Sequence, residues 1–183
     1  GIYMAHADTT ADNLLTFDSC IWKQNLASYQ GGAFAIDNER TTVFFNSCHF
    51  DSNKANGGNG GGALHLRLAR AYLQSCTFNS NQAAAADSKG GAIRIDKATD
   101  AVIDTCQFST DQSSSNAQSI YASNQVSNLT ILGSTFINEG DNKAKTHHVL
   151  YAESKELLVQ NSTFTFDNPT RAIRCAHFIP PCN

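Results

Sequence analysis

A repeat of about 28 residues is the feature of this sequence that most constrains its fold. When the chain is compared with itself at this spacing, one position carries a cysteine four times and then a serine twice. An aromatic residue follows two positions later, and an asparagine or an acidic residue follows three positions after that. Because a fixed period of roughly 20–50 residues is typical of solenoids, propellers and repeat arrays, the repeat decides the architecture first. The three positions hold Cys20, Cys48, Cys76, Cys106, Ser134 and Ser162; Trp22, Phe50, Phe78, Phe108, Phe136 and Phe164; and Asn25, Asn53, Asn81, Asp111, Glu139 and Asp167.

Each copy contains three short apolar runs separated by turn residues. The positions five and three residues before the cysteine are mostly apolar, as at Val43 and Phe45. In the next run the cysteine and the aromatic residue turn inward, as at Cys76 and Phe78, and residues 63–66 alternate again. Period-two alternation indicates short strands with one buried face, and no copy shows the 3.6-residue period of a helix. We therefore predict an all-β, right-handed parallel β-helix of about six coils, with three short strands in each coil.

Stacked coils would place like residues about 4.8 Å apart in continuous columns. We expect the aromatic column to fill the core and the asparagine column to satisfy backbone groups at a bend. Residues 1–183 are expected to form a single β-helix domain. Gly1-Ile2-Tyr3-Met4 is similar to the start of a third strand, so the chain is expected to open in mid-coil, as a fragment or as a subunit.

The cysteine column leaves two interpretations open. Stacked Cα atoms at about 4.8 Å lie within disulfide range, which would allow Cys20–Cys48 and Cys76–Cys106 bridges between neighbouring coils. Alternatively, the four thiols are free and buried, and act as small hydrophobic side chains. A further disulfide between Cys175 and Cys182 would close a loop near the C-terminus.

Composition excludes several classes of partner. The net charge of −3 gives no basic footprint for nucleic acid, and no apolar run approaches the roughly 20 residues of a membrane span. No cysteine and histidine spacing indicates a metal site, and we expect no cofactor. Asn128 and Asn161 begin N-glycosylation sequons, which favours an extracellular or cell-surface location.

Two tetrapeptides alternate in phase along the chain. Gly-Gly-Ala followed by an aliphatic residue occurs at residues 61–64 and 90–93, and Phe-x-x-Asn occurs at residues 50–53 and 78–81. This pattern resembles the repeats of the chlamydial polymorphic outer-membrane proteins. The resemblance implies a β-helical passenger region that is exposed on a surface and used in adhesion. More broadly, the repeat looks like the pectin-lyase-like superfamily, which includes polysaccharide lyases and hydrolases.

The third strand of each coil presents one candidate site. Its outward positions are predicted to align His65, Arg94, Tyr121 and Tyr151 on one flat face, which would suit glycan binding. The alternative is an ordinary solvated sheet face whose charge pairs contribute little. A second column places Arg67 between Asp37 and Asp96, which neutralises the acids and argues against a catalytic centre.

These observations favour a non-catalytic extracellular β-solenoid that serves as a surface adhesin or a structural segment. Its expected partners are other protein subunits, or glycans and proteins of a cell surface. The first alternative is a subunit of an extracellular filament, a homo-polymer in which coils stack end to end. The second is a polysaccharide lyase or hydrolase, which is disfavoured because a fold alone does not establish function.

Overall fold

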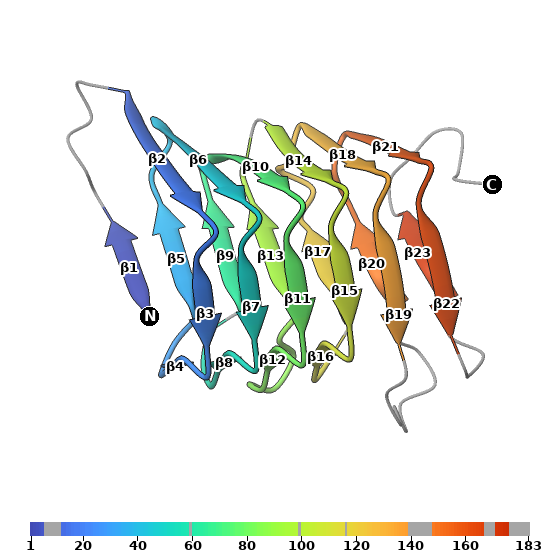
Figure 1. Ribbon diagram of the computed structural model, residues 1–183, viewed down its shortest axis with the longest axis horizontal. Helices are drawn as coiled ribbons and strands as arrows, with labels where there is room; N and C mark the ends of the chain where they lie inside the picture. Colours follow the sequence, from blue (N-terminus) through green and yellow to red (C-terminus); the bar gives the residue numbers. More distant parts are fainter. Residues whose placement is uncertain are drawn as a thin grey trace.

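The computed structural model describes residues 1–5, 12–58, 60–98, 100–115, 117–138, 148–166 and 171–175, and these residues contain strands and turns but no helix. The strands form four parallel sheets, here named A to D (Figure 1).

Sheet A contains β1 (Ile2–Ala5), β5 (Phe34–Asp37), β9 (Leu64–Arg67), β13 (Ile93–Asp96), β17 (Ile120–Ala122), β20 (His148–Ala152) and β23 (Arg171–Cys175). Sheet B contains β2 (Asn13–Asp18), β6 (Thr41–Asn46), β10 (Arg70–Gln74), β14 (Asp100–Asp104), β18 (Asn128–Leu132) and β21 (Glu156–Gln160). Sheet C contains β3 (Ile21–Lys23), β7 (His49–Asp51), β11 (Thr77–Asn79), β15 (Gln107–Ser109), β19 (Thr135–Asn138) and β22 (Thr163–Phe166). Sheet D contains β4 (Leu26–Ala27), β8 (Lys54–Ala55), β12 (Gln82–Ala83) and β16 (Gln112–Ser113).

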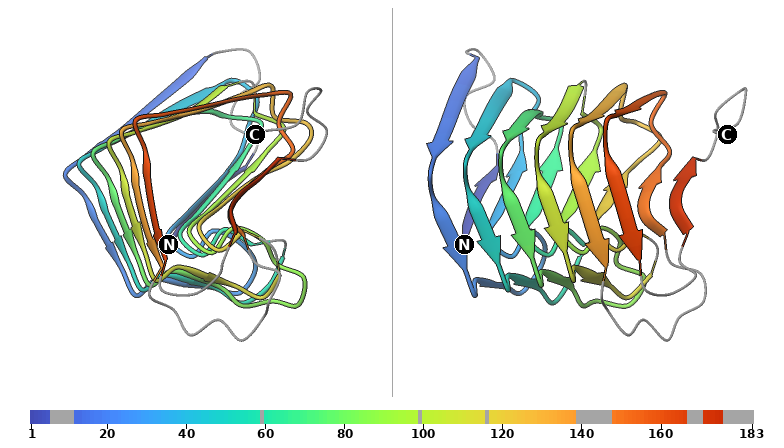
Figure 2. Two further views of the ribbon diagram at one scale, coloured as in Figure 1. Left: turned by 90° about the vertical axis from the view of Figure 1, so that its right-hand side faces the viewer. Right: turned by 45° about the vertical axis from the view of Figure 1, so that its right-hand side comes forward.

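The chain winds as a right-handed parallel β-helix, as predicted. Seen from the C-terminal end, it passes counter-clockwise through sheets B, C and A while it advances toward the viewer (Figure 2). Sheets B and C each contain six strands, which corresponds to about five full turns between the first and the last pass, slightly fewer than the six coils expected. Four coils also contain a two-residue strand in sheet D, between the strand of sheet C and the strand of sheet A.

The corner between sheets B and C explains why cysteine and serine share one repeat position. In all six coils the residue before this position has a positive φ of about 51–54°, as at Ser47 and Ser75, so the chain turns sharply there. The side chain that follows then points back to a main-chain carbonyl. Cys76 Sγ donates to Phe45 O of the preceding coil at 3.2 Å, and Ser134 Oγ donates to Leu132 O at 2.9 Å. A thiol and a hydroxyl therefore satisfy the same corner.

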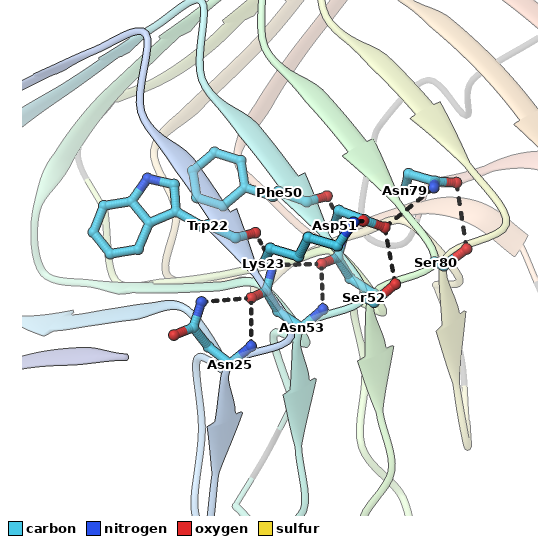
Figure 3. Close-up of polar contacts among 10 residues, drawn as sticks. Trp22, Lys23, Asn25, Phe50, Asp51, Ser52, Asn53, Asn79 and Ser80 are labelled. Atoms are coloured by element: carbon cyan, nitrogen blue, oxygen red, sulfur yellow. Dashed lines mark hydrogen bonds and ion pairs between the residues drawn. The ribbon is translucent and has the colours of Figure 1, made fainter.

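The corner between sheets C and D is held by an asparagine ladder (Figure 3). The Asn53 carboxamide oxygen accepts hydrogen bonds from the backbone N–H and the side-chain Nδ2 of Asn25, at 3.0 and 2.9 Å. Asn53 Nδ2 in turn donates to Asn81 Oδ1 at 3.0 Å and to Trp22 O at 2.9 Å. Because Asn53 and Asn81 are fully buried, these bonds replace the water that a corner in the backbone would otherwise need.

The aromatic column packs inside the coil next to this ladder. From Phe50 to Phe164 the rings stack face to face with centroids 4.7–4.8 Å apart, and Trp22 extends the stack at 6.1 Å. Sheet B supplies a second layer, in which Phe45 meets Phe50 edge to face at 5.5 Å. Burial of each ring contributes on the order of 2–3 kcal/mol, so this column is a principal source of stability.

The paired glycines lie where the chain enters sheet A. Gly90 has a φ of +72°, and a Cβ on Gly91 would lie 2.1 Å from Gln118 O of the next coil. No side chain fits in that space, because backbone atoms of two other segments already occupy it. In the sequence, the Gly-Gly motif therefore indicates where neighbouring coils are in close contact.

Asp111 occupies the next rung of the asparagine ladder and is buried. Its Oδ1 accepts both Asn81 donors, at 2.8 and 2.9 Å, but its Oδ2 has no hydrogen-bond partner among the described residues. Burial raises the pKa of Asp111 to about 7, although the bonds from Asn81 act in the opposite direction. Asn81 Nδ2 donates to Phe50 O, and the equivalent carbonyl one coil later is that of Phe78. A proton on Asp111 Oδ2 would therefore face the carbonyl of Phe78. Glu139, the next residue of this column in sequence, lies outside the described residues.

We predict that Asp111→Asn stabilises the protein at pH 8 by on the order of 1–3 kcal/mol, because an amide restores a donor where a buried carboxylate is left unpaired. The folded pKa lies above the unfolded value, so wild-type stability should fall as the pH rises from about 4 to about 7. The substitution should remove that slope. Urea unfolding at pH 4, 6 and 8 measures it, and Asn81→Asp, which adds a carboxylate one rung earlier, should have the opposite effect. Equal slopes for wild type and Asp111→Asn would contradict the prediction.

Candidate functional site

The outward positions of sheet A form the column that the sequence predicts. The register aligns Ala35, His65, Arg94, Tyr121, Tyr151 and Arg174 on successive strands, and it extends the column to Tyr3 on β1. Two residues further along the strands, Arg67 lies opposite both Asp37 and Asp96. Parallel pairing in strict register therefore brings side chains from seven strands onto one face.

This face is not the open, flat surface that we expected. His65, Tyr121 and Tyr151 are only 2%, 4% and 7% exposed, and the side chain of Arg94 is 13% exposed. Ala117, which precedes β17, packs with both tyrosines in a small apolar cluster. The reason is that the segments leading into sheet A fold back over its outer side, which periodicity within the strands does not reveal. The alternative of a solvated sheet face is therefore wrong for these residues.

The acidic groups in the first half of the face are paired with cations. Arg67 forms an ion pair with Asp37. Asp96 Oδ2 lies 2.6 Å from Arg94 Nε and 3.1 Å from His65 Nε2. Burial raises the pKa of Asp96, but the hydrogen bonds from His65 and Arg94, together with the charge of Arg94, outweigh it and hold the pKa well below its usual value.

The second half of the face is an aromatic cluster around one carboxylate. The hydroxyls of Tyr121 and Tyr151 both donate to Glu153, at 2.7 and 2.8 Å. Lys89 Nζ lies 4.5 Å from the ring centroid of Tyr121 and 5.6 Å from that of Tyr151, which is cation–π geometry. Burial, and then the bonds to Glu153, raise the pKa of both tyrosines, so they remain neutral hydroxyl donors.

This arrangement suits structure better than acid–base chemistry. A general base needs a free carboxylate with a raised pKa, whereas Asp96 is paired and has a lowered one. His65 differs from the paired groups on this face, because its Nδ1 is buried without a hydrogen-bond partner among the described residues. The described residues contain no cluster of three or more His, Cys, Asp or Glu that would hold a metal ion. His148 lies on β20, and His147 lies outside the described residues.

The structure favours free thiols over inter-coil disulfides in the cysteine column. Cys20, Cys48, Cys76 and Cys106 are free thiols, and the last three are fully buried. Their sulfur atoms lie against backbone carbonyls at the corner, and the thiols of Cys48 and Cys76 also contact those of Cys20 and Cys106. Burial raises the pKa of Cys48 to about 11, which keeps it protonated. Cys175 is disulfide-bonded, and Cys182 lies outside the described residues.

The two sequons occupy accessible positions. Asn128 is exposed at the start of β18, where its Nδ2 donates to Asp100 at 2.8 Å. Asn161 is exposed at the last corner between sheets B and C. Their glycosylation stays a prediction.

Sequence reasoning missed two features. Lys89 lies outside the repeated strand positions, and only the folded path of its segment brings it over Tyr121. On sheet B, Phe44 and Tyr72 stack with their ring centroids 5.0 Å apart on the outer face. Both precede the cysteine position by four residues, so the repeat contained a signal for this aromatic pair.

One comparison with known proteins, against family models, agrees with this geometry. The family model described as the Chlamydia polymorphic membrane protein (Chlamydia_PMP) repeat matches residues 75–96. The match begins at the turn of Ser75 and ends with β13, so it includes one rung of the asparagine ladder and one Gly-Gly turn. Comparison with curated proteins and with solved structures gave no match. The described residues also include no helix with the length and apolar character of a membrane span.

Fold and repeat together define a parallel β-solenoid of the kind represented by the polymorphic membrane protein repeat. The match spans one of the repeat units, and the register of the sheets shows that the neighbouring coils follow the same plan. The broader likeness to the pectin-lyase-like superfamily stays a prediction.

We predict that Asp96→Asn lowers stability at pH 7 by about 2–4 kcal/mol, because it removes the negative charge that pairs with the mostly buried Arg94. The folded pKa of Asp96 lies below the unfolded value, so its contribution is present above about pH 4 and is lost as the pH falls below that. The difference between wild type and variant should therefore shrink in acid. Thermal unfolding at pH 3 and pH 7 measures it, with the exposed Asp87→Asn as the matched control. A variant as stable as the control at pH 7 would show that the ion pair is dispensable.

Proposed function

We propose that this protein is a surface-exposed, non-catalytic β-solenoid that acts as an adhesin-type binding segment. The observation that carries the proposal is the polymorphic membrane protein repeat at residues 75–96, because that description associates the repeat with membrane proteins. The structure supplies a physical reason for the role. A column of inward side chains holds the rod together, while the outward positions vary from coil to coil. Such a rod presents different side chains along an extended surface.

The state of the acidic groups supports a role without catalysis. Asp37 and Asp96 are each in ion pairs, and Glu153 accepts two tyrosine hydroxyls. The arrangement lacks the free acid and base pair that glycoside cleavage uses. Because sheet A is covered, the glycan-binding role predicted for His65, Arg94, Tyr121 and Tyr151 would need the covering segments to move.

We predict that the native protein is labelled when intact source cells are treated with a membrane-impermeant amine reagent, which would modify exposed lysines such as Lys23. Beads coated with the folded chain should adhere to cell surfaces, and beads coated with the heat-denatured chain should not. A panel of polysaccharides incubated with the protein should release no new reducing ends. Labelling only after permeabilisation would contradict the proposed location, and cleavage abolished by Asp96→Asn would contradict the non-catalytic role.

The first coil favours a second candidate, end-to-end assembly into a filament. Strands β1, β2, β3 and β4 are the outermost strands of the four sheets, at the blue end in Figure 1. A hollow of about 440 Å³ lies between β1 and the turn that follows β4. Six large apolar side chains are 43–73% exposed on this coil: Ile2, Tyr3, Leu14, Ile21, Leu26 and Tyr29. A sheet edge with exposed apolar groups is a template for a further coil, and the filament candidate takes that coil from a second copy.

We predict that assembly, if it uses this end, is weakened by Leu26→Lys, because it replaces an exposed apolar group by a charge on an edge strand, which disfavours further strand pairing. Light scattering and negative-stain microscopy at increasing protein concentration should show uniform fibres for the wild type and monomers for the variant. Ile137→Lys is the matched control, since Ile137 is an exposed aliphatic side chain on β19, which is an interior strand of sheet C. A wild type that stays monodisperse at high concentration would contradict assembly into a filament.

A further inference from the structure

The outer face of sheet B carries a step in side-chain size. One outward column runs through Thr16, Phe44, Tyr72, Val102, Thr130 and Leu158 on six successive strands. Phe44 and Tyr72 stack with an interplanar angle of 14°, so their ring faces point along the solenoid axis. Phe44 covers one face of Tyr72. Val102 is the next residue and is much shorter, so the other face of Tyr72 rises above it as a wall.

A shallow hollow of about 210 Å³ lies at this step. Phe44, Tyr72 and Val102 form its apolar side, and Asn46, Gln74 and Asp104 line the other. This volume is below the roughly 300–1,000 Å³ of sites for drug-sized ligands, so it would suit a single small ring. One aromatic wall beside a row of amides and a carboxylate is amphipathic, unlike an interface between protein cores.

The polar row has unused hydrogen-bonding capacity. The Gln74 carboxamide is exposed and makes no hydrogen bond within the described part of the chain. Asp104 Oδ1 accepts from Thr105 at 2.8 Å, which leaves Oδ2 available. Asn46 Nδ2 donates to Asp18 at 2.6 Å, which leaves its oxygen as an acceptor. Donor and acceptor groups therefore alternate beside the aromatic wall.

We propose that this hollow is a binding subsite for a neutral pyranose sugar. The C–H groups on one side of a pyranose carry slight positive charge and would lie against the negative face of Tyr72. Its hydroxyls are both donors and acceptors, which matches the Gln74 amide and the Asp104 carboxylate. The nearby carboxylates of Asp104 and Asp18 disfavour an acidic sugar by like-charge repulsion. The inference rests on the proposed surface-binding role, and it assigns that role a ligand class and a position on sheet B.

Saturation-transfer NMR with the folded chain tests the subsite. The probes are methyl β-glucoside, methyl β-galactoside and methyl α-mannoside, and each is compared with methyl β-glucuronide, which differs from the glucoside by a carboxylate. At about 10 mM sugar, which detects millimolar affinities, we expect transfer from aromatic protons to the ring protons of at least one neutral pyranoside. The glucuronide should give at least a threefold weaker signal. No transfer to any neutral probe, or equal transfer to the glucuronide, would overturn the proposal.

Two variants place the binding at the step. Val102→Tyr extends the aromatic column and fills the hollow, and tyrosine suits an exposed strand position, so the fold should persist while binding is lost. Leu158→Tyr adds the same ring to the same column two coils away and should keep binding. If Val102→Tyr binds as strongly as the wild type, the sugar lies elsewhere and the subsite is wrong.

The same variants separate this proposal from the wider one. If coated beads adhere to cells and Val102→Tyr adheres equally well, the adhesive role stands and the sugar subsite fails. If the wild type adheres to no surface yet binds the pyranoside, the subsite stands and the adhesive role fails.

Discussion

The structure depends on hydrogen bonding between coils in strict register. Every β-strand is parallel to its counterpart one turn away, so each side chain meets the side chain at the same repeat position. The corners are the weak points of such a coil, because the backbone turns there and leaves polar groups to be satisfied. Asn53 and Asn81 solve this at one corner, and Cys76 and Ser134 solve it at another. Left-handed residues before both positions make the turns sharp enough for the columns to align.

The repeat was sufficient to predict the fold and the columns, because a period of about 28 residues fixes where each side chain lies around the coil. It did not predict what lies over the coil. Lys89 and Ala117 belong to segments of variable length, and their contacts with Tyr121 arise only when those segments fold back. The two-residue strands of sheet D are too short to show alternation. In the cysteine column, periodicity likewise gives the spacing of the Cα atoms but not the rotamer that directs Cys48 Sγ to Phe17 O.

The two outer faces differ in what they leave free. On sheet A, the charges of Asp96 and Glu153 are used by neighbours, and the tyrosines are buried. Such a network is suited to holding coils in register, since each carboxylate contacts residues from more than one coil. On sheet B, Gln74 keeps unused hydrogen-bonding capacity beside an accessible ring. The face with the more conspicuous residues in sequence is therefore the more structural one, and the plainer face is better placed to meet a ligand.

This contrast follows from how a solenoid divides its positions. Inward columns must stay uniform, because Phe78 stacks between Phe50 and Phe108 at 4.7 and 4.8 Å and a smaller residue would open a cavity in the column. Outward columns carry no such constraint, so residue size can change from one coil to the next without cost to the core. A change from Tyr72 to Val102 creates a hollow with one aromatic wall, while a uniform outward column would create a smooth stripe. Specific recognition by a rod of this kind should therefore occur at breaks in its outward periodicity, and the repeat that reveals the fold also shows where such breaks lie.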